Sequence, residues 1–187
     1  MRRPALALAL LAALPAAAQT PVPAVSDSAA CAALTDENPA AAAEAARAWG
    51  RVGGGLEAAI CESLALAALG AFRTAAQRLE IYAARSSRLP PVQRAGLYEL
   101  MAGLHLADGD YEAARIDADA GIALNPPGDL ATLLRLRRAA AFVDLGRNAS
   151  ALADLNLVIA TMDGAEARLL RARLHRLGGR PEAAAED

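Results

Sequence analysis

The chain has no lysine, two histidines and two cysteines, and aromatic residues make up only 3% of its 187 residues. All 19 basic residues are therefore arginines; they stand against 21 acidic residues, and the formal net charge is −2. A mildly acidic chain with so few aromatic side chains offers neither a broad basic surface nor a platform on which bases stack. We therefore expect no nucleic-acid partner.

Residue patterns that support catalysis are missing as well. The sequence contains no paired carboxylates suited to acid–base chemistry, no serine-centred elbow, no cysteine–histidine pair and no phosphate-binding glycine loop. Gly53-Gly54-Gly55 has no following Lys-Ser/Thr, so we interpret it as a connector. We predict that the protein is not an enzyme and that it has no cofactor and no metal site.

One acidic segment has part of the spacing of a calcium-binding loop, with Asp108, Asp110, Glu112 and Asp119 at its acidic positions. Ala113 stands where such a loop requires glycine, and the last acid is an aspartate instead of the usual bidentate glutamate. We therefore interpret the segment as a turn between helices, followed by acids near a helix N-terminus, where the helix dipole favours them.

The first 18 residues resemble a secretory signal peptide. Arg2 and Arg3 make the start basic, residues 5–14 are uncharged and apolar, and Ala16 and Ala18 suit a signal peptidase. The apolar run is too short to span a bilayer. We therefore expect cleavage near Ala18, a periplasmic or secreted protein, and no integral membrane segment in the mature chain; a buried N-terminal helix is the alternative.

The segment after the signal peptide is predicted in two parts. Residues 19–27 are proline-rich and without helical period, which indicates a flexible leader. Residues 28–55 indicate degenerate capping helices, the second of which starts at an Asn38-Pro39 cap. Because exported proteins form disulfides, we expect a bond between Cys31 and Cys61; two separate buried thiols are the alternative.

A glycine turn recurs four times in the rest of the chain. Each glycine follows an apolar stretch of helical period, and an alanine five residues later opens another, so the repeated unit is helix, tight turn, helix. The steps between the glycines are 39, 37 and 33 residues. The four copies are Gly70 with Ala75, Gly109 with Ala114, Gly146 with Ala151, and Gly179 with Ala184.

This period and pattern resemble the tetratricopeptide repeat (TPR) family, in which alanine at the helix crossing lets two backbones approach closely. The second copy fits best, with Tyr98, Tyr111, Ala114 and Pro126 at the spacing of the family. The resemblance covers about residues 56–187, as three complete repeats and a truncated fourth. It implies an all-α fold, a right-handed α-solenoid of stacked helical hairpins; another helical-hairpin solenoid is the alternative.

His105 and His175 both occupy a position where the TPR pattern has tyrosine. Two repeats of a stack separate them, roughly 20 Å at a helix spacing of about 10 Å. They are too far apart to share a metal, and we assign them structural roles.

The resemblance also implies that the first helix of each hairpin lines a concave binding face. The side chains there are mainly apolar, with arginines towards the C-terminal end that suggest a basic region able to hold acidic groups. Ordinary solvated arginines are the alternative interpretation. The face would consist of Ile60, Leu64, Glu99, Gly103, Leu106, Leu133, Leu136, Arg137, Ala140, Leu169, Arg173 and Arg176.

The function that follows from the resemblance is a non-catalytic scaffold that binds another protein or peptide through its concave face. The richness in alanine and arginine and the lack of lysine suggest a bacterial source, so we expect this scaffold in the periplasm. A helical cell-envelope hydrolase and a purely structural spacer within a larger assembly are the alternatives. No residue pattern identifies the partner.

Overall fold

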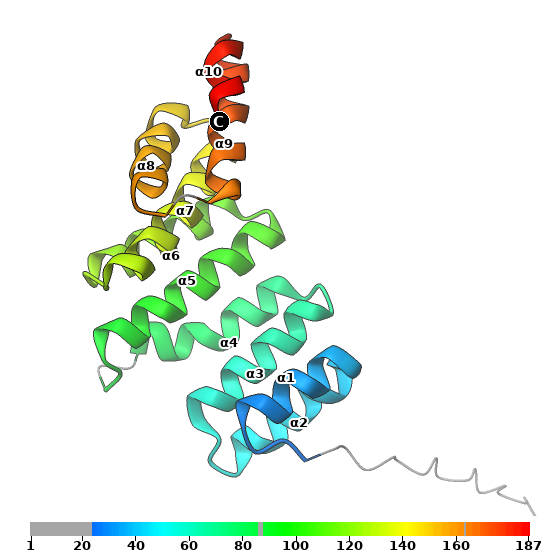
Figure 1. Ribbon diagram of the computed structural model, residues 1–187. Coiled ribbons are helices and arrows are strands. Elements are labelled where there is room, and N and C mark those ends of the chain that lie inside the picture. The colour runs from blue at the N-terminus through cyan, green and yellow to red at the C-terminus, as the bar shows by residue number, and fades with distance from the viewer. Residues whose placement is uncertain (1–23, 86–87, 163) are drawn as a thin grey trace, which may run out of the picture.

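The structure, a computed structural model, describes residues 24–85, 88–162 and 164–187. The described residues form ten α-helices and no strand (Figure 1), which confirms the predicted all-α class. The expected signal peptide, residues 1–18, lies outside them. In chain order the helices are α1 (Ser28–Glu37), α2 (Pro39–Arg51), α3 (Gly55–Ala68), α4 (Phe72–Arg85), α5 (Pro91–Asp108), α6 (Tyr111–Ala123), α7 (Gly128–Asp144), α8 (Asn148–Thr161), α9 (Ala165–Leu177) and α10 (Pro181–Glu186).

Side-chain caps fix the starts of three helices. Asp27 accepts a hydrogen bond from the amide of Ala30 at the start of α1, at 2.9 Å. Asn38 caps α2 in the same way, with Pro39 at the first helical position, as the sequence predicts. Asp110 caps α6 by accepting from the amide of Ala113 at 3.1 Å.

The four repeated glycines each end a helix in the left-handed conformation. Their φ angles are 76° at Gly70, 79° at Gly109, 71° at Gly146 and 69° at Gly179. Glycine adopts this backbone without the steric cost that a Cβ atom brings. The alanine five residues later is fully buried in the first three hairpins and half-buried in the fourth, where it is Ala184.

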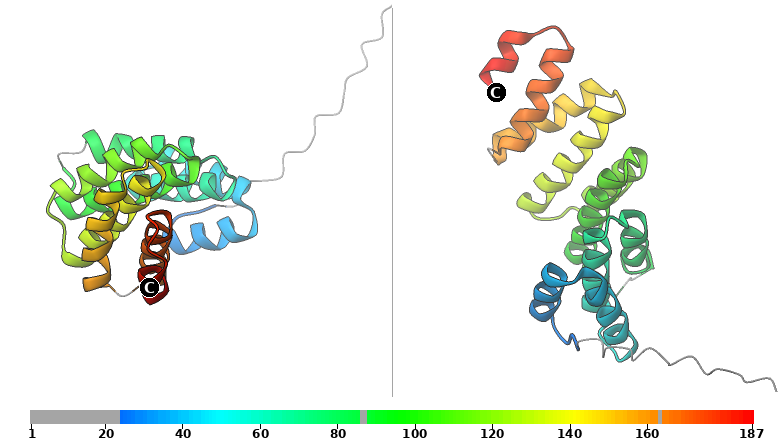
Figure 2. Two further views of the ribbon diagram at one scale, coloured as in Figure 1. Left: turned by 90° about the horizontal axis from the view of Figure 1, so that it is seen from above. Right: turned by 90° about the vertical axis from the view of Figure 1, so that its right-hand side faces the viewer.

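Each helix packs against the next one in the chain, and first helices of neighbouring hairpins also pack together in three places: α1 on α3, α5 on α7, and α7 on α9. The helices α3 and α5, both fully described, form no comparable contact, and α4 packs against both of them. Figures 1 and 2 show the resulting elongated arrangement of hairpins.

At the N-terminal end, α1, α2 and α3 pack around a disulfide between Cys31 and Cys61, which confirms the predicted bond. Trp49 and Val25 belong to the same cluster, and Val25 is only 7% exposed. The flexible leader predicted over residues 19–27 is therefore wrong for its last residues, because Val25 is buried and Asp27 caps α1.

Two larger apolar clusters follow along the stack. The first joins α3, α4 and α5 around Leu79, and the second joins α7, α8 and α9 around Leu155 and Leu174. Between them, Gly121 of α6 is buried so tightly that a Cβ atom there would lie 2.6 Å from a methyl carbon of Leu134. Small residues on α6 thus let α5, α6 and α7 approach one another closely.

Candidate functional site

Two residues of the expected binding face, Ile60 and Leu64, line a pocket between α1 and α3. The pocket has a volume of about 360 Å³, and the disulfide cysteines Cys31 and Cys61 also line it. Leu64 is 43% exposed. The remaining lining residues are Ser28, Ala32, Thr35, Asp36 and Glu57.

The charged residues of the expected face largely pair with acids of the chain itself. Arg137 on α7 donates from Nε to Oε1 of Glu99 on α5 at 2.9 Å. The Nη2 atom of Arg173 lies 3.5 Å from Oδ1 of Asp144. Of the three arginines expected to form a basic end, Arg176 alone has no ion-pair partner among the described residues.

The apolar residues of the expected face differ in exposure. Leu136 is only 8% exposed and packs in the core with Val143, so its assignment to a binding surface is corrected. Leu106 is half-buried, whereas Leu169 on α9 is 71% exposed. Among the apolar residues of the expected face, Leu64 on α3 and Leu169 on α9 are therefore the most exposed.

A second arrangement, which the sequence pattern did not reveal, repeats within the hairpins. The side chain eight residues before each turn glycine faces the side chain eight residues after it. Around Gly146, Arg138 donates from Nε and Nη2 to the two carboxylate oxygens of Asp154, both at 2.8 Å. Around Gly179, Arg171 donates in the same manner to Asp187, whose side chain is 1% exposed.

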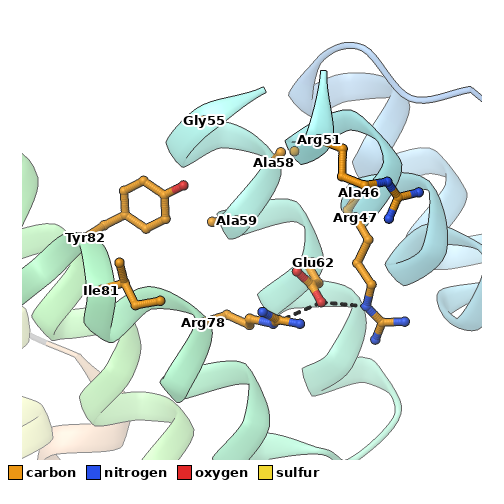
Figure 3. A pocket seen from close by; sticks show the side chains of 11 residues that line it. Ala46, Arg47, Arg51, Gly55, Ala58, Ala59, Glu62, Arg78, Ile81 and Tyr82 are labelled. Atoms are coloured by element: carbon orange, nitrogen blue, oxygen red, sulfur yellow. Dashed lines mark hydrogen bonds and ion pairs between the residues drawn. The ribbon is translucent and has the colours of Figure 1, made fainter. Parts of the chain in front are cut away.

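The α3–α4 hairpin, around Gly70, has the same pair with the charges exchanged. Glu62 precedes Gly70 by eight residues, and Nε of Arg78, eight residues after it, lies 3.1 Å from Glu62 Oε1. Arg47 of α2 donates to the same oxygen at 2.7 Å (Figure 3). These three charged side chains lie on a pocket of about 400 Å³ between α2, α3 and α4.

The α5–α6 hairpin, around Gly109, has the acid of the pair but not the arginine. Met101 stands eight residues before Gly109, and Asp117 stands eight residues after it. Asp117 is 8% exposed, and its Oδ2 finds no hydrogen-bond partner in the described parts of the chain. Burial and, to a smaller extent, the charges of Glu80 and Asp110 raise the pKa of Asp117 to about 7.

Asp117 lies on a pocket of about 490 Å³ between α4, α5 and α6. This pocket is the counterpart, one hairpin later, of the pocket in Figure 3: Tyr98 takes the place of Ala59, and Asp117 takes the place of Arg78. Its other polar lining residues are Arg73, Gln77, Glu80, His105 and Asp110.

Each histidine contacts the aspartate of its own hairpin, twelve residues further along the chain. Nε2 of His105 lies 3.5 Å from Oδ2 of Asp117, and Nε2 of His175 lies 3.9 Å from Oδ2 of Asp187. A histidine–aspartate pair supplies the base of a hydrolytic triad only when a nucleophile is within reach. The described residues that line the pocket at His105 include no serine, threonine or cysteine.

The four acids with partial calcium-loop spacing are each bound by other groups of the chain. Asp110 is the cap of α6, and Asp108 binds Arg73. Glu112 and Asp119 both bind Arg115. The segment is a turn followed by ion pairs along α6, as the sequence interpretation expects.

No group of three or more histidine, cysteine, aspartate or glutamate side chains within residues 24–85, 88–162 and 164–187 is arranged to hold a metal ion. In those same ranges, no helix combines the length and the apolar character needed to cross a membrane. Comparisons with protein-family models, curated proteins and solved structures found no match to this chain.

Proposed function

We propose that this chain is a non-catalytic scaffold that binds a peptide segment of another protein, and that its hairpins build a TPR-like right-handed α-solenoid. The binding face consists of the first helices, α3, α5, α7 and α9, together with α1. Support comes from the stacking of α1 on α3, α5 on α7 and α7 on α9, which is the packing that stacked hairpins use to bury their apolar faces.

The pocket between α1 and α3 is the observation that carries this proposal. It combines a half-exposed leucine, Leu64, with the volume of a small ligand pocket, and the Cys31–Cys61 disulfide ties its two walls together. A wall held in place in the free protein lowers the entropy lost on binding. The pocket suits one large apolar side chain of a partner peptide, which would cover Leu64.

The same disulfide supports a proposal about the compartment. Disulfides persist in oxidising environments such as the bacterial periplasm, and the cysteines of the described chain are joined in one bond. We propose export by the signal peptide at residues 1–18 and action in the periplasm.

The test is capture of a partner from periplasmic extract by immobilised mature protein, residues 19–187. Leu64→Asp places a charge in the pocket and should abolish capture. Leu157→Asp is the matched control, because Leu157 is 54% exposed but lies on α8, a second helix of a hairpin. Capture that survives Leu64→Asp, or that is lost equally with Leu157→Asp, would contradict a binding site at this pocket.

A further inference from the structure

The α5–α6 hairpin lacks the arginine that pairs with the aspartate in the last two hairpins. In the last two hairpins, a buried aspartate receives a guanidinium from the position eight residues before the turn glycine, occupied by Arg138 or Arg171. Met101 occupies that position in the α5–α6 hairpin and packs in the apolar core. Asp117 is therefore buried at a place where the fold elsewhere supplies a cation.

His105 does not substitute for the missing arginine. Its Nε2 lies 3.5 Å from Asp117, beyond the usual range of a hydrogen bond. The last hairpin also has its histidine, His175, and there Arg171 still makes the hydrogen bonds to Asp187. The histidine thus accompanies the arginine–aspartate pair and leaves the carboxylate of Asp117 short of a donor.

The pocket beside Asp117 has room and charge for an added cation. Three carboxylates line it, those of Glu80, Asp110 and Asp117. Its one lining arginine, Arg73, is engaged by Asp108 through two hydrogen bonds of 3.0 and 2.8 Å. Within the described residues these carboxylates do not converge as metal ligands do. An organic cation needs only a cavity of this size and an acceptor without a partner, which Asp117 Oδ2 supplies.

We propose that the α4–α5–α6 pocket binds a guanidinium group, an arginine side chain of a partner polypeptide, and that this arginine completes at Asp117 the pair that other hairpins form within the chain. A planar guanidinium donates two parallel hydrogen bonds to a carboxylate, as Arg138 does to Asp154. Tyr98 is on the same lining, and a guanidinium can stack on an aromatic ring.

This site is independent of the peptide-binding pocket at Leu64. The Leu64 pocket lies between α1 and α3, whereas the guanidinium site lies between α4, α5 and α6. The two pockets share no lining residue. Loss of the Leu64 site would leave the guanidinium site intact, and the reverse also holds.

The test uses N-acetyl-arginine amide as the probe and the imidazole NMR signals of His105 and His175 as the readout, with the mature, disulfide-bonded protein at pH 7.5. We expect a saturable shift of the His105 signal at millimolar probe and no shift of His175, whose aspartate is already paired. N-acetyl-citrulline amide, the uncharged isostere, should bind at least about tenfold more weakly than the arginine probe, since a charge-assisted hydrogen bond is lost.

Two variants check that the response comes from Asp117. Asp117→Asn keeps the shape of the side chain and should weaken arginine binding at least about tenfold. Met101→Arg supplies the guanidinium from within the chain and should abolish binding. An equal response to citrulline, an unchanged affinity of Asp117→Asn, or no saturable shift of the wild-type His105 signal would overturn the proposal.

Discussion

Arg138 on α7 and Asp154 on α8 are joined by two hydrogen bonds of 2.8 Å, with the guanidinium laid against the carboxylate as a fork. Asp154 is only 4% exposed. Arg138 also donates to Asp119 of α6 at 2.8 Å, so one side chain connects three helices. Each of the two side chains needs the other, because a buried charge without a partner lowers the stability of the folded protein.

Arg138→Met should destabilise the protein by about 3 kcal/mol, because it strands the carboxylate of Asp154 in the core. Adding Asp154→Leu should recover a large part of that loss, since an apolar pair of similar volume leaves no charge unpaired. Urea denaturation of both variants measures the two free energies of unfolding. A double variant that is less stable than the single one would rule out this explanation.

Asp117 should make the protein less stable as the pH rises from about 4 to 7. Its pKa is about 7 in the folded chain and about 3.9 when unfolded, so the folded chain binds more protons in this window and the free energy of unfolding falls with pH. The loss amounts to at most about 4 kcal/mol. The charged or titratable groups around it are His105 on α5, Glu80 and Arg73 on α4, and Asp110 at the start of α6.

Asp117→Asn isolates this contribution. At pH 4.5 the ionisation of Asp117 should lower the stability of the wild type by only about 1 kcal/mol, because the side chain is then protonated in the folded chain and ionised only in the unfolded chain. At pH 8 the variant should be the more stable of the two. Urea midpoints measured across this range give the comparison, and a stability difference that does not change with pH would contradict the raised pKa.

The Cys31–Cys61 disulfide should contribute roughly 3–4 kcal/mol, because it closes a loop with a sequence separation of 30 residues. Cys31→Ser should therefore lower the melting temperature. The wild-type protein under reducing conditions is the matched comparison and should melt close to the variant. Two free thiols in unfolded, non-reduced wild-type protein would show that the bond does not form.

Gly121→Ala should destabilise the protein by about 1–3 kcal/mol, because the new Cβ would lie 2.6 Å from Leu134 and 3.1 Å from Tyr98. Gly96→Ala on α5 is the control, since nothing lies within 4 Å of its Cβ position. That change should stabilise the helix by about 0.5–1 kcal/mol. Thermal unfolding of both variants measures these changes. Equal shifts of the two melting temperatures would count against the close approach of α5, α6 and α7.

The local pattern of the chain predicted much of the fold. The glycine turns and the buried alanines mark the hairpins, because a left-handed turn and a close helix crossing each require a particular small residue. The first helix of the last hairpin, expected over residues 165–177, has those bounds in the structure. The disulfide followed from the number of cysteines and the expected compartment.

The site at Asp117 was harder to predict, because it depends on which side chains meet across a hairpin. Glu62–Arg78 has the opposite polarity to Arg138–Asp154, so no conserved charge order marks the position in the sequence. Met101 is also an ordinary core residue when taken alone. Asp117 becomes distinctive only when its hairpin is compared with the others, since the missing partner is then apparent.

The small residues of α6 affect how the protein unfolds. Ala114, Ala118 and Gly121 bury little apolar surface, and they lie between the cluster around Leu79 and the cluster around Leu155. The junction is therefore held mainly by close backbone packing and by the ion pairs Arg137–Glu99 and Arg138–Asp119, and once these are lost the two clusters can unfold as separate cooperative units. Native-state amide hydrogen exchange should then show one common opening free energy within α3–α5 and a different one within α7–α9.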